Sequence, residues 1–142
     1  MPLTSDQQRF IEEHAAAAMI TLGDDGRPKA ARVGIALIDG RLLSSGTTDR
    51  VRTKRLRQNP ECTIFVFEMG FRWLTLEATV AILEGPDSID TTVALFRAMQ
   101  NRPTGSLNWC GGELDEDLFR AQMDQEGRLL YEFEVTKAYG SP

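Results

Sequence analysis

The sequence RLLSSGTTDRVRTKRLRQNP, residues 41–60, contains the most informative pattern in the chain. It opens with an apolar pair typical of a strand, continues through hydroxyl side chains and a glycine, and ends in a basic run compatible with a helix. The chain has a net charge of −5, so the positive charge of this segment is local. Five of the 16 basic residues fall within eight positions that contain no acid, namely Arg50, Arg52, Lys54, Arg55 and Arg57.

The segment brings hydroxyl groups and a helix N-terminus next to cationic side chains. Backbone N–H groups at a helix start, together with arginine and lysine, suit an anion, most simply a phosphate. The alternative is a solvated helix face, which is the commoner role of a basic run. The preceding Ser-Ser-Gly-Thr-Thr sequence has no purpose in a solvated helix, and it makes a phosphate site an equally good interpretation.

Hairpin patterns precede this segment. Asp25-Gly26 and Asp39-Gly40 are typical of tight turns between antiparallel strands. An amphipathic helix is predicted over residues 5–14 from a capping box, Ser5-x-x-Gln8, and helical apolar spacing. The predicted strands before the basic helix cover residues 17–22, 28–38 and 41–45.

Three further strands are predicted after the basic helix, which Asn59-Pro60 should end. They cover residues 61–67, 71–83 and 128–135, and the second is long enough to be bent or bulged. Two helices, from residue 87 or 88 to about 100 and over 115–125, flank a loop at 101–112 that carries Trp109. About six strands joined mainly by hairpins predict an antiparallel barrel in one domain, residues 1–142.

Composition restricts the class of protein. The hydrophobic fraction of 42% is ordinary for a globular protein, and no apolar run reaches the ~20 residues of a membrane helix. Without a secretory signal pattern at its N-terminus, the chain is expected in the cytoplasm. The lack of a long apolar run predicts no membrane contact. Cys62 and Cys110 have no partners at metal-ligand spacing, and the only histidine, His14, is expected to pack or face solvent at the end of its helix, so we expect no metal site. The acidic net charge disfavours a nucleic-acid partner.

Three segments of the sequence together resemble the flavin and deazaflavin split-barrel family. This family includes pyridoxamine phosphate oxidase-like proteins and oxidoreductases that use coenzyme F420. The segments are DGRP at residues 25–28, SGTTDRVR through LRQNP at residues 45–60, and RWLTLEA at residues 72–78. The resemblance extends from the first helix to Tyr139-Gly140, and it implies a six-stranded antiparallel split β-barrel, mainly β with helices, that forms a homodimer.

The resemblance also implies roles for individual residues. Arg52 stands where the family commonly has a basic residue that reaches the cofactor phosphate, and Ser45 and Thr47 stand where strand-end hydroxyls meet it. The strand through Arg32 and Val33 would lie against the tricyclic ring, largely through its backbone. The predicted cofactor contacts are Arg32, Val33, Ser45, Thr47, Arg50, Arg52, Lys54, Arg55 and Trp73.

Two positions depart from the family pattern. Arg55 replaces a frequent Asn and adds charge near the phosphate. Ala78 replaces a frequent Gly, which leaves the register of that strand open. Trp73, Phe71 and Trp109 are candidates to shape the acceptor pocket, and each could instead belong to the core or to a dimer contact.

The charge of the segment favours one cofactor of the family over the other. F420 carries a phosphodiester and a polyglutamate tail, whereas FMN carries one phosphate, so five basic residues suit F420 better. We therefore expect an F420-dependent oxidoreductase that transfers a hydride to a planar conjugated small molecule, with catalytic residues unassigned. The alternatives are an FMN-dependent oxidoreductase and a non-enzymatic flavin- or haem-binding split barrel.

Overall fold

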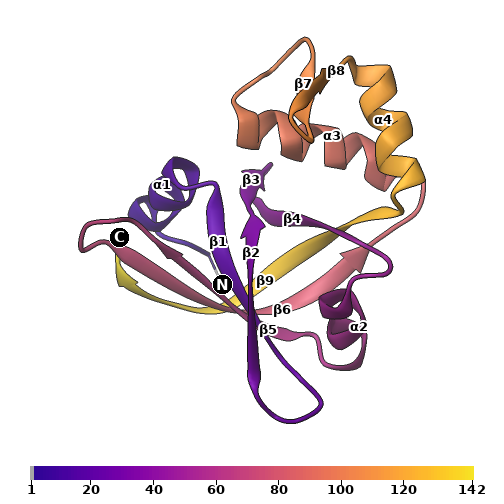
Figure 1. Ribbon diagram of the computed structural model, residues 1–142. Coiled ribbons are helices and arrows are strands. Elements are labelled where there is room, and N and C mark those ends of the chain that lie inside the picture. Colours follow the sequence, from indigo (N-terminus) through magenta and orange to yellow (C-terminus); the bar gives the residue numbers. More distant parts are fainter. Residues whose placement is uncertain (1) are drawn as a thin grey trace.

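A curled antiparallel sheet forms the larger part of the molecule (Figure 1). The computed structural model describes residues 2–142. Seven strands follow one another across the sheet in the order β2-β1-β5-β6-β9-β4-β3, and every neighbouring pair is antiparallel. Their bounds are β1 (Ala16–Leu22), β2 (Pro28–Gly34), β3 (Ala36–Ile38), β4 (Arg41–Thr47), β5 (Glu61–Phe67), β6 (Trp73–Leu83) and β9 (Arg128–Ser141).

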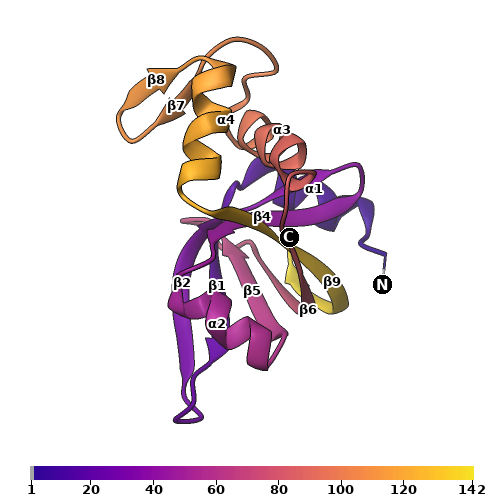
Figure 2. The same ribbon diagram turned by 90° about the vertical axis from the view of Figure 1, so that its right-hand side faces the viewer.

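Four helices and a second, small sheet complete the described chain. The strands β7 (Leu107–Trp109) and β8 (Gly112–Leu114) form a hairpin. Together with α3 and α4 they make an insertion between β6 and β9, which stands beyond one end of the large sheet in Figures 1 and 2. The helices are α1 (Ser5–Glu13), α2 (Val51–Gln58), α3 (Ser88–Gln100) and α4 (Glu116–Gln125).

The antiparallel half-barrel confirms the predicted arrangement, but the predicted count of six strands is wrong. The predicted strand 28–38 is two strands, because Ile35 leaves the ladder between β2 and β3 and its backbone N–H donates to the Ala15 carbonyl at 2.9 Å. The side chain of Ile35 is buried, so this break folds the sheet over its own core. The bulge expected in the long strand is present between Glu77 and Ala78.

Two local predictions need correction. The capping box of α1 lies one residue earlier than expected, because Thr4 and Gln7 exchange the two cap hydrogen bonds. The predicted loop 101–112 contains the β7–β8 hairpin, whose two turn residues, Cys110 and Gly111, have positive φ. A turn with positive φ at both central residues usually has the sequence Asn-Gly or Asp-Gly. Because this turn has Cys-Gly instead, the usual sequence pattern did not predict the hairpin.

A buried hydroxyl network attaches α2 to the sheet. Thr53 of α2 donates to the backbone carbonyl of Thr47 at 2.7 Å, and its hydroxyl is also hydrogen bonded to the Tyr131 hydroxyl of β9. The side chains of Thr53 and Tyr131 are fully buried. Gly46 of β4 permits this arrangement, because a Cβ there would overlap the Tyr131 ring and hydroxyl. The basic helix therefore has one defined position relative to β4 and β9.

The insertion has its own apolar cluster, to which Phe96, Phe119 and Met123 contribute. A polar joint connects this cluster to the sheet at Glu126, just after α4. The Glu126 carboxylate accepts from Trp109 Nε1 at 2.9 Å and from Arg128 Nη2 at 2.9 Å. Burial raises the pKa of Glu126, but hydrogen bonds from Gln122, Arg128 and Trp109 outweigh it, so the pKa lies below its ordinary value.

The contact of Gly46 with Tyr131 predicts a destabilising substitution. Gly46→Ala should lower the free energy of unfolding by about 1–3 kcal/mol, because a rigid buried ring must shift to make room for the new methyl group. Gly112→Ala is the matched control, since the nearest atom to a Cβ there is the Trp109 carbonyl oxygen at 3.8 Å. Urea unfolding followed by circular dichroism measures both variants, and equal stability of the two would contradict the steric explanation.

The Glu126 joint predicts a pH-dependent stability. Its folded-state pKa is below the unfolded value of about 4.3, so its stabilisation is present above that pH and is lost as the pH falls through the folded-state pKa. The difference in thermal midpoint between wild type and Glu126→Gln should be largest near neutral pH and shrink below about pH 4. Glu12→Gln, at an exposed position, is the control for the loss of one carboxylate. A pH-independent difference for Glu126→Gln would argue against the joint.

Candidate functional site

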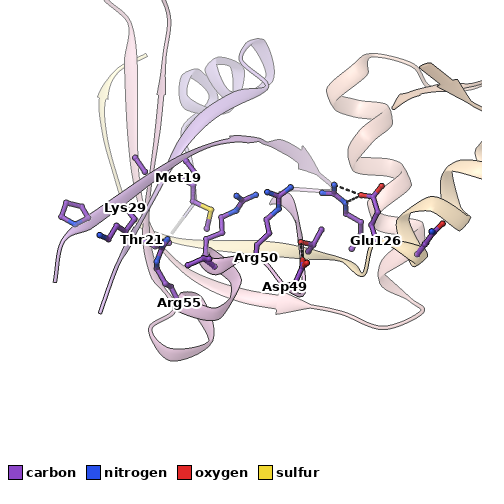
Figure 3. Close-up of a pocket in the computed structure, with 15 residues that line it drawn as sticks. Met19, Thr21, Lys29, Asp49, Arg50, Arg55 and Glu126 are labelled. Carbon is purple, nitrogen blue, oxygen red and sulfur yellow. Dashed lines mark hydrogen bonds and ion pairs between the residues drawn. The ribbon is translucent and has the colours of Figure 1, made fainter. Parts of the chain in front are cut away.

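A groove of about 1160 Å³ runs along the N-terminal end of α2 (Figure 3). The strands β1 and β2 form one wall, and the end of β4 and the α4–β9 corner form the other. In Figure 3, Lys29 and Thr21 lie at one end of the groove and Glu126 at the other, with Arg50 and Asp49 between them. Segments distant in the sequence therefore meet around one open cavity.

Positive charge dominates the lining of this groove. Two carboxylates, Asp49 and Glu126, accompany the cations. Glu126 is engaged by Arg128, and the Asp49 carboxylate accepts from Thr47 Oγ1 at 2.6 Å, the main cause of its lowered pKa. The lining cations are Lys29, Arg50, Arg52, Arg55 and Arg128.

The arginines that face the groove at the start of α2 and along it differ from Arg57 on the same helix. Arg50, Arg52 and Arg55 form no ion pair with any carboxylate of residues 2–142. By contrast, Arg57 on the outer side of α2 pairs with Glu84 at 2.9 Å. Arg55 donates to the Thr21 hydroxyl at 3.3 Å, a neutral partner. The groove thus presents uncompensated charge.

Arg52 carries the clearest sign of a missing partner. Its Nε atom is buried and has no hydrogen-bond partner among the described residues. Burial lowers the pKa of the Arg52 guanidinium from its ordinary value. A buried donor without an acceptor costs free energy, and an anion in the groove would remove this cost. The donor set therefore fits a phosphate or carboxylate ligand.

The start of α2 is also open to an anion. Its N-cap residue, Arg50, makes no side-chain cap hydrogen bond, and its first turn contains no acid. The backbone N–H groups of this turn are therefore available, and the helix dipole favours negative charge there. This agrees with the phosphate interpretation of the basic segment.

The structure divides the nine predicted cofactor contacts into three groups. Thr47, Arg50, Arg52 and Arg55 line the groove. A smaller cavity beside the groove is lined by Arg32, Val33, Ser45 and again Arg52.

Two predicted contacts, Lys54 and Trp73, line neither cavity. Lys54 is exposed on the outer side of α2. The ring centroid of Trp73 lies 6.0 Å from that of Phe65 and 6.3 Å from that of Tyr139, in an aromatic cluster across β5, β6 and β9. The structure therefore does not bring these two side chains to either cavity of this chain, and their contact with a cofactor stays a prediction.

Sequence reasoning missed Arg128, which borders both cavities. Its side chain is 10% exposed, and its guanidinium lies 4.8 Å over the Trp109 ring. The pairing of β4 with β9 sets Arg128 opposite Thr47. No local pattern around residue 128 indicates this, since only strand register brings it to the basic segment.

Residues that often carry chemistry lie outside the groove. His14 Nδ1 is 2.8 Å from the Phe10 carbonyl oxygen, and its ring packs against Phe10 at the end of α1. Cys62 is a small core residue, and its burial raises the pKa of its thiol to about 12. Within residues 2–142 no group of three or more His, Cys, Asp or Glu could hold a metal ion, and no described helix is long and apolar enough to cross a membrane.

Solved structures share this fold at low sequence identity. The conserved hypothetical protein Rv2991 from Mycobacterium tuberculosis matches with a TM-score of 0.76 at 18% identity, over 99% of this chain and 85% of that chain. An F420 reductase matches with a TM-score of 0.69 at 16% identity, over 96% of this chain and 98% of that chain. HutZ, the heme storage protein from Vibrio cholerae, matches with a TM-score of 0.66 at 16% identity, over 99% of this chain and 95% of that chain. At such identities the likeness shows the fold alone.

Sequence comparison identifies the family. A search of curated proteins found no significant match. The family model described as pyridoxamine 5'-phosphate oxidase, in contrast, matches residues 3–140. Since this match spans nearly the whole chain, the protein belongs to the pyridoxamine 5'-phosphate oxidase family, whose split-barrel fold its half-barrel sheet displays.

Proposed function

We propose that this protein is an F420-dependent oxidoreductase that transfers a hydride from the reduced deazaflavin to a planar conjugated acceptor. The observation that carries the proposal is the set of unpaired arginines in the groove, with the buried Arg52 Nε left without a partner. Coenzyme F420 offers a phosphodiester and several tail carboxylates, so it can engage more than one of these side chains.

The bound cofactor would supply the hydride chemistry, and the protein would supply binding and orientation. Arg50 and Arg52 would hold the phosphodiester together with the open N-terminus of α2, and Arg55 and Lys29 would meet the tail carboxylates. The ring would lie along β2, which is an edge strand with peptide groups unpaired on its outer side. Ala30 and Ala31 line the groove there, and their small side chains leave the backbone accessible.

FMN is the alternative cofactor within the same family. Its single phosphate would satisfy Arg52 and the helix N-terminus, but it would leave Arg55 without an anionic partner. The number of cations in the groove therefore favours F420. A haem-binding role has less support, because the only histidine, His14, lies outside the groove and faces the Phe10 carbonyl.

We also propose that the protein works as a homodimer. Large apolar side chains are exposed around the β5–β6 hairpin, with Phe67 54% and Phe71 97% exposed. Phe67 stacks on Phe65 at 5.4 Å and continues the aromatic cluster that contains Trp73. An exposed aromatic patch of this kind is typical of a surface that a partner covers. In the dimer, Trp73 could thus meet the partner's site although it lines no cavity of its own chain.

The dimer proposal predicts that Phe67→Glu yields a folded monomer. The new carboxylate would place charge in an apolar contact, whereas the monomer fold would be retained because the side chain is half exposed. Leu118→Glu is the matched control, since Leu118 is 57% exposed on α4, away from the aromatic cluster. Light scattering after gel filtration measures the mass. A wild-type monomer, or a dimer that persists in Phe67→Glu, would contradict this interface.

The cofactor proposal predicts tighter binding of F420 than of FMN. Fluorescence titration of the purified protein with each cofactor measures both affinities. We expect at least about a tenfold preference for F420, because each additional charged hydrogen bond contributes about 1.5–3 kcal/mol. A preference for FMN would assign the protein to the flavin branch, and binding of neither would overturn the oxidoreductase proposal.

The groove itself is tested by paired variants on α2. Arg52→Ala should weaken F420 binding about tenfold or more, since it removes a charged donor that has no protein partner. Lys54→Ala is the matched control: it removes one positive charge from the same helix, but from a side chain outside the groove. The thermal midpoints of both variants should stay close to wild type. Equal loss of affinity in the two variants would show that the overall charge of the helix, and not the position of Arg52 in the groove, determines F420 binding.

A further inference from the structure

A second cavity of about 500 Å³ adjoins the groove, between the large sheet and the insertion. The sheet contributes the beginning of β1, the end of β2 and Ser45 of β4, and the insertion contributes α3 and β7. Arg52 and Arg128 line both cavities and thus stand at their boundary. A molecule in the second cavity would therefore lie next to a ligand in the groove.

The insertion gives this cavity an apolar wall made of Phe96, Met99 and Trp109. The Trp109 ring packs edge-on against Phe96 and Phe119, with ring centroids 5.4 Å and 6.0 Å apart, respectively. Its Nε1 donates to Glu126, which fixes the remaining rotation of the indole. A preorganised aromatic wall suits a planar conjugated ligand, because the wall loses little conformational entropy when the ligand packs against it.

The cavity also has a cationic lining. Arg32, Arg52 and Arg128 line it, and no carboxylate does. Glu126 engages Arg128 from outside the cavity, whereas Arg32 has no carboxylate partner in the described chain. The charge balance of the cavity therefore favours an anionic ligand.

We infer that this cavity is the acceptor subsite and that it takes a planar conjugated molecule bearing a carboxylate or a similar oxyanion. The inference rests on the proposed function, whose cofactor would occupy the neighbouring groove. The volume lies within the range of about 300–1,000 Å³ typical of small-molecule sites. The aromatic wall would contact the conjugated part of the ligand, and the lining arginines would bind the oxyanion.

Isothermal titration calorimetry on the full chain tests this inference with two probes of equal shape. The probes are 2-naphthoate, which is anionic, and 2-naphthamide, which is neutral. With F420 at saturation, 2-naphthoate should bind at least about tenfold more tightly than the amide, since only the carboxylate forms charge-assisted hydrogen bonds with the lining arginines. Absence of naphthoate binding, equal affinity of the two probes, or competitive displacement of naphthoate by F420 would each overturn the acceptor subsite.

Substitutions at the cavity locate the bound probe. Ala15→Trp should fill the cavity from its rim and abolish naphthoate binding, and Ala98→Trp, exposed on α3 outside the cavity, should not. Arg32→Gln should weaken naphthoate binding about tenfold and leave naphthamide unchanged. Arg27→Gln is its control, because Arg27 is exposed and lines neither cavity. Equal effects within either pair would overturn the assignment, provided that thermal midpoints confirm folding.

The same titrations separate the two proposals. F420 binding without naphthoate binding would overturn the acceptor subsite and leave the proposed function standing. Naphthoate binding by a protein that binds neither F420 nor FMN would overturn the proposed function, and the acceptor role of this cavity with it.

Discussion

The hydroxyl network between Tyr131, Thr53 and Thr47 fixes the position of the basic helix, and the candidate site depends on it. The helix α2 has only eight residues, too few to be stable by itself in water. Its orientation therefore comes from tertiary contacts, of which the buried bonds of Thr53 are the most specific. Gly46 allows the Tyr131 ring to lie directly against β4. The direction in which Arg52 and Arg55 point follows from this attachment.

The arginines show a division between structural and functional charge. Most cations away from the groove meet carboxylates at the surface, such as Arg41 with Glu132 and Arg57 with Glu84. Those on the inner side of α2 do not, and the buried Arg52 Nε has no acceptor among the described residues. A ligand anion that satisfies this donor would bind with correspondingly greater affinity. Uncompensated charge held by a rigid scaffold is typical of a site prepared for a partner.

The insertion changes a simple curled sheet into a molecule with two adjoining cavities. Its apolar cluster stabilises α3, α4 and the small hairpin, and Leu95 of α3 packs against Leu43 and Leu130 of the sheet. Glu126 then couples the Trp109 wall to Arg128 at the boundary of both cavities. Through this joint, the geometry of the second cavity depends on the packing of the insertion.

The sequence by itself determined the hairpins, the basic helix and the antiparallel class, because turn residues and apolar alternation act between near neighbours. Helical periodicity could also have separated Arg52 and Arg55, three residues apart on one face, from Lys54 and Arg57 on another. Only the tertiary structure decided the break at Ile35, the exclusion of Trp73 from the cavities and the inclusion of Arg128. These depend on strand register and on the packing of the insertion, which join residues far apart in the chain and leave no local pattern.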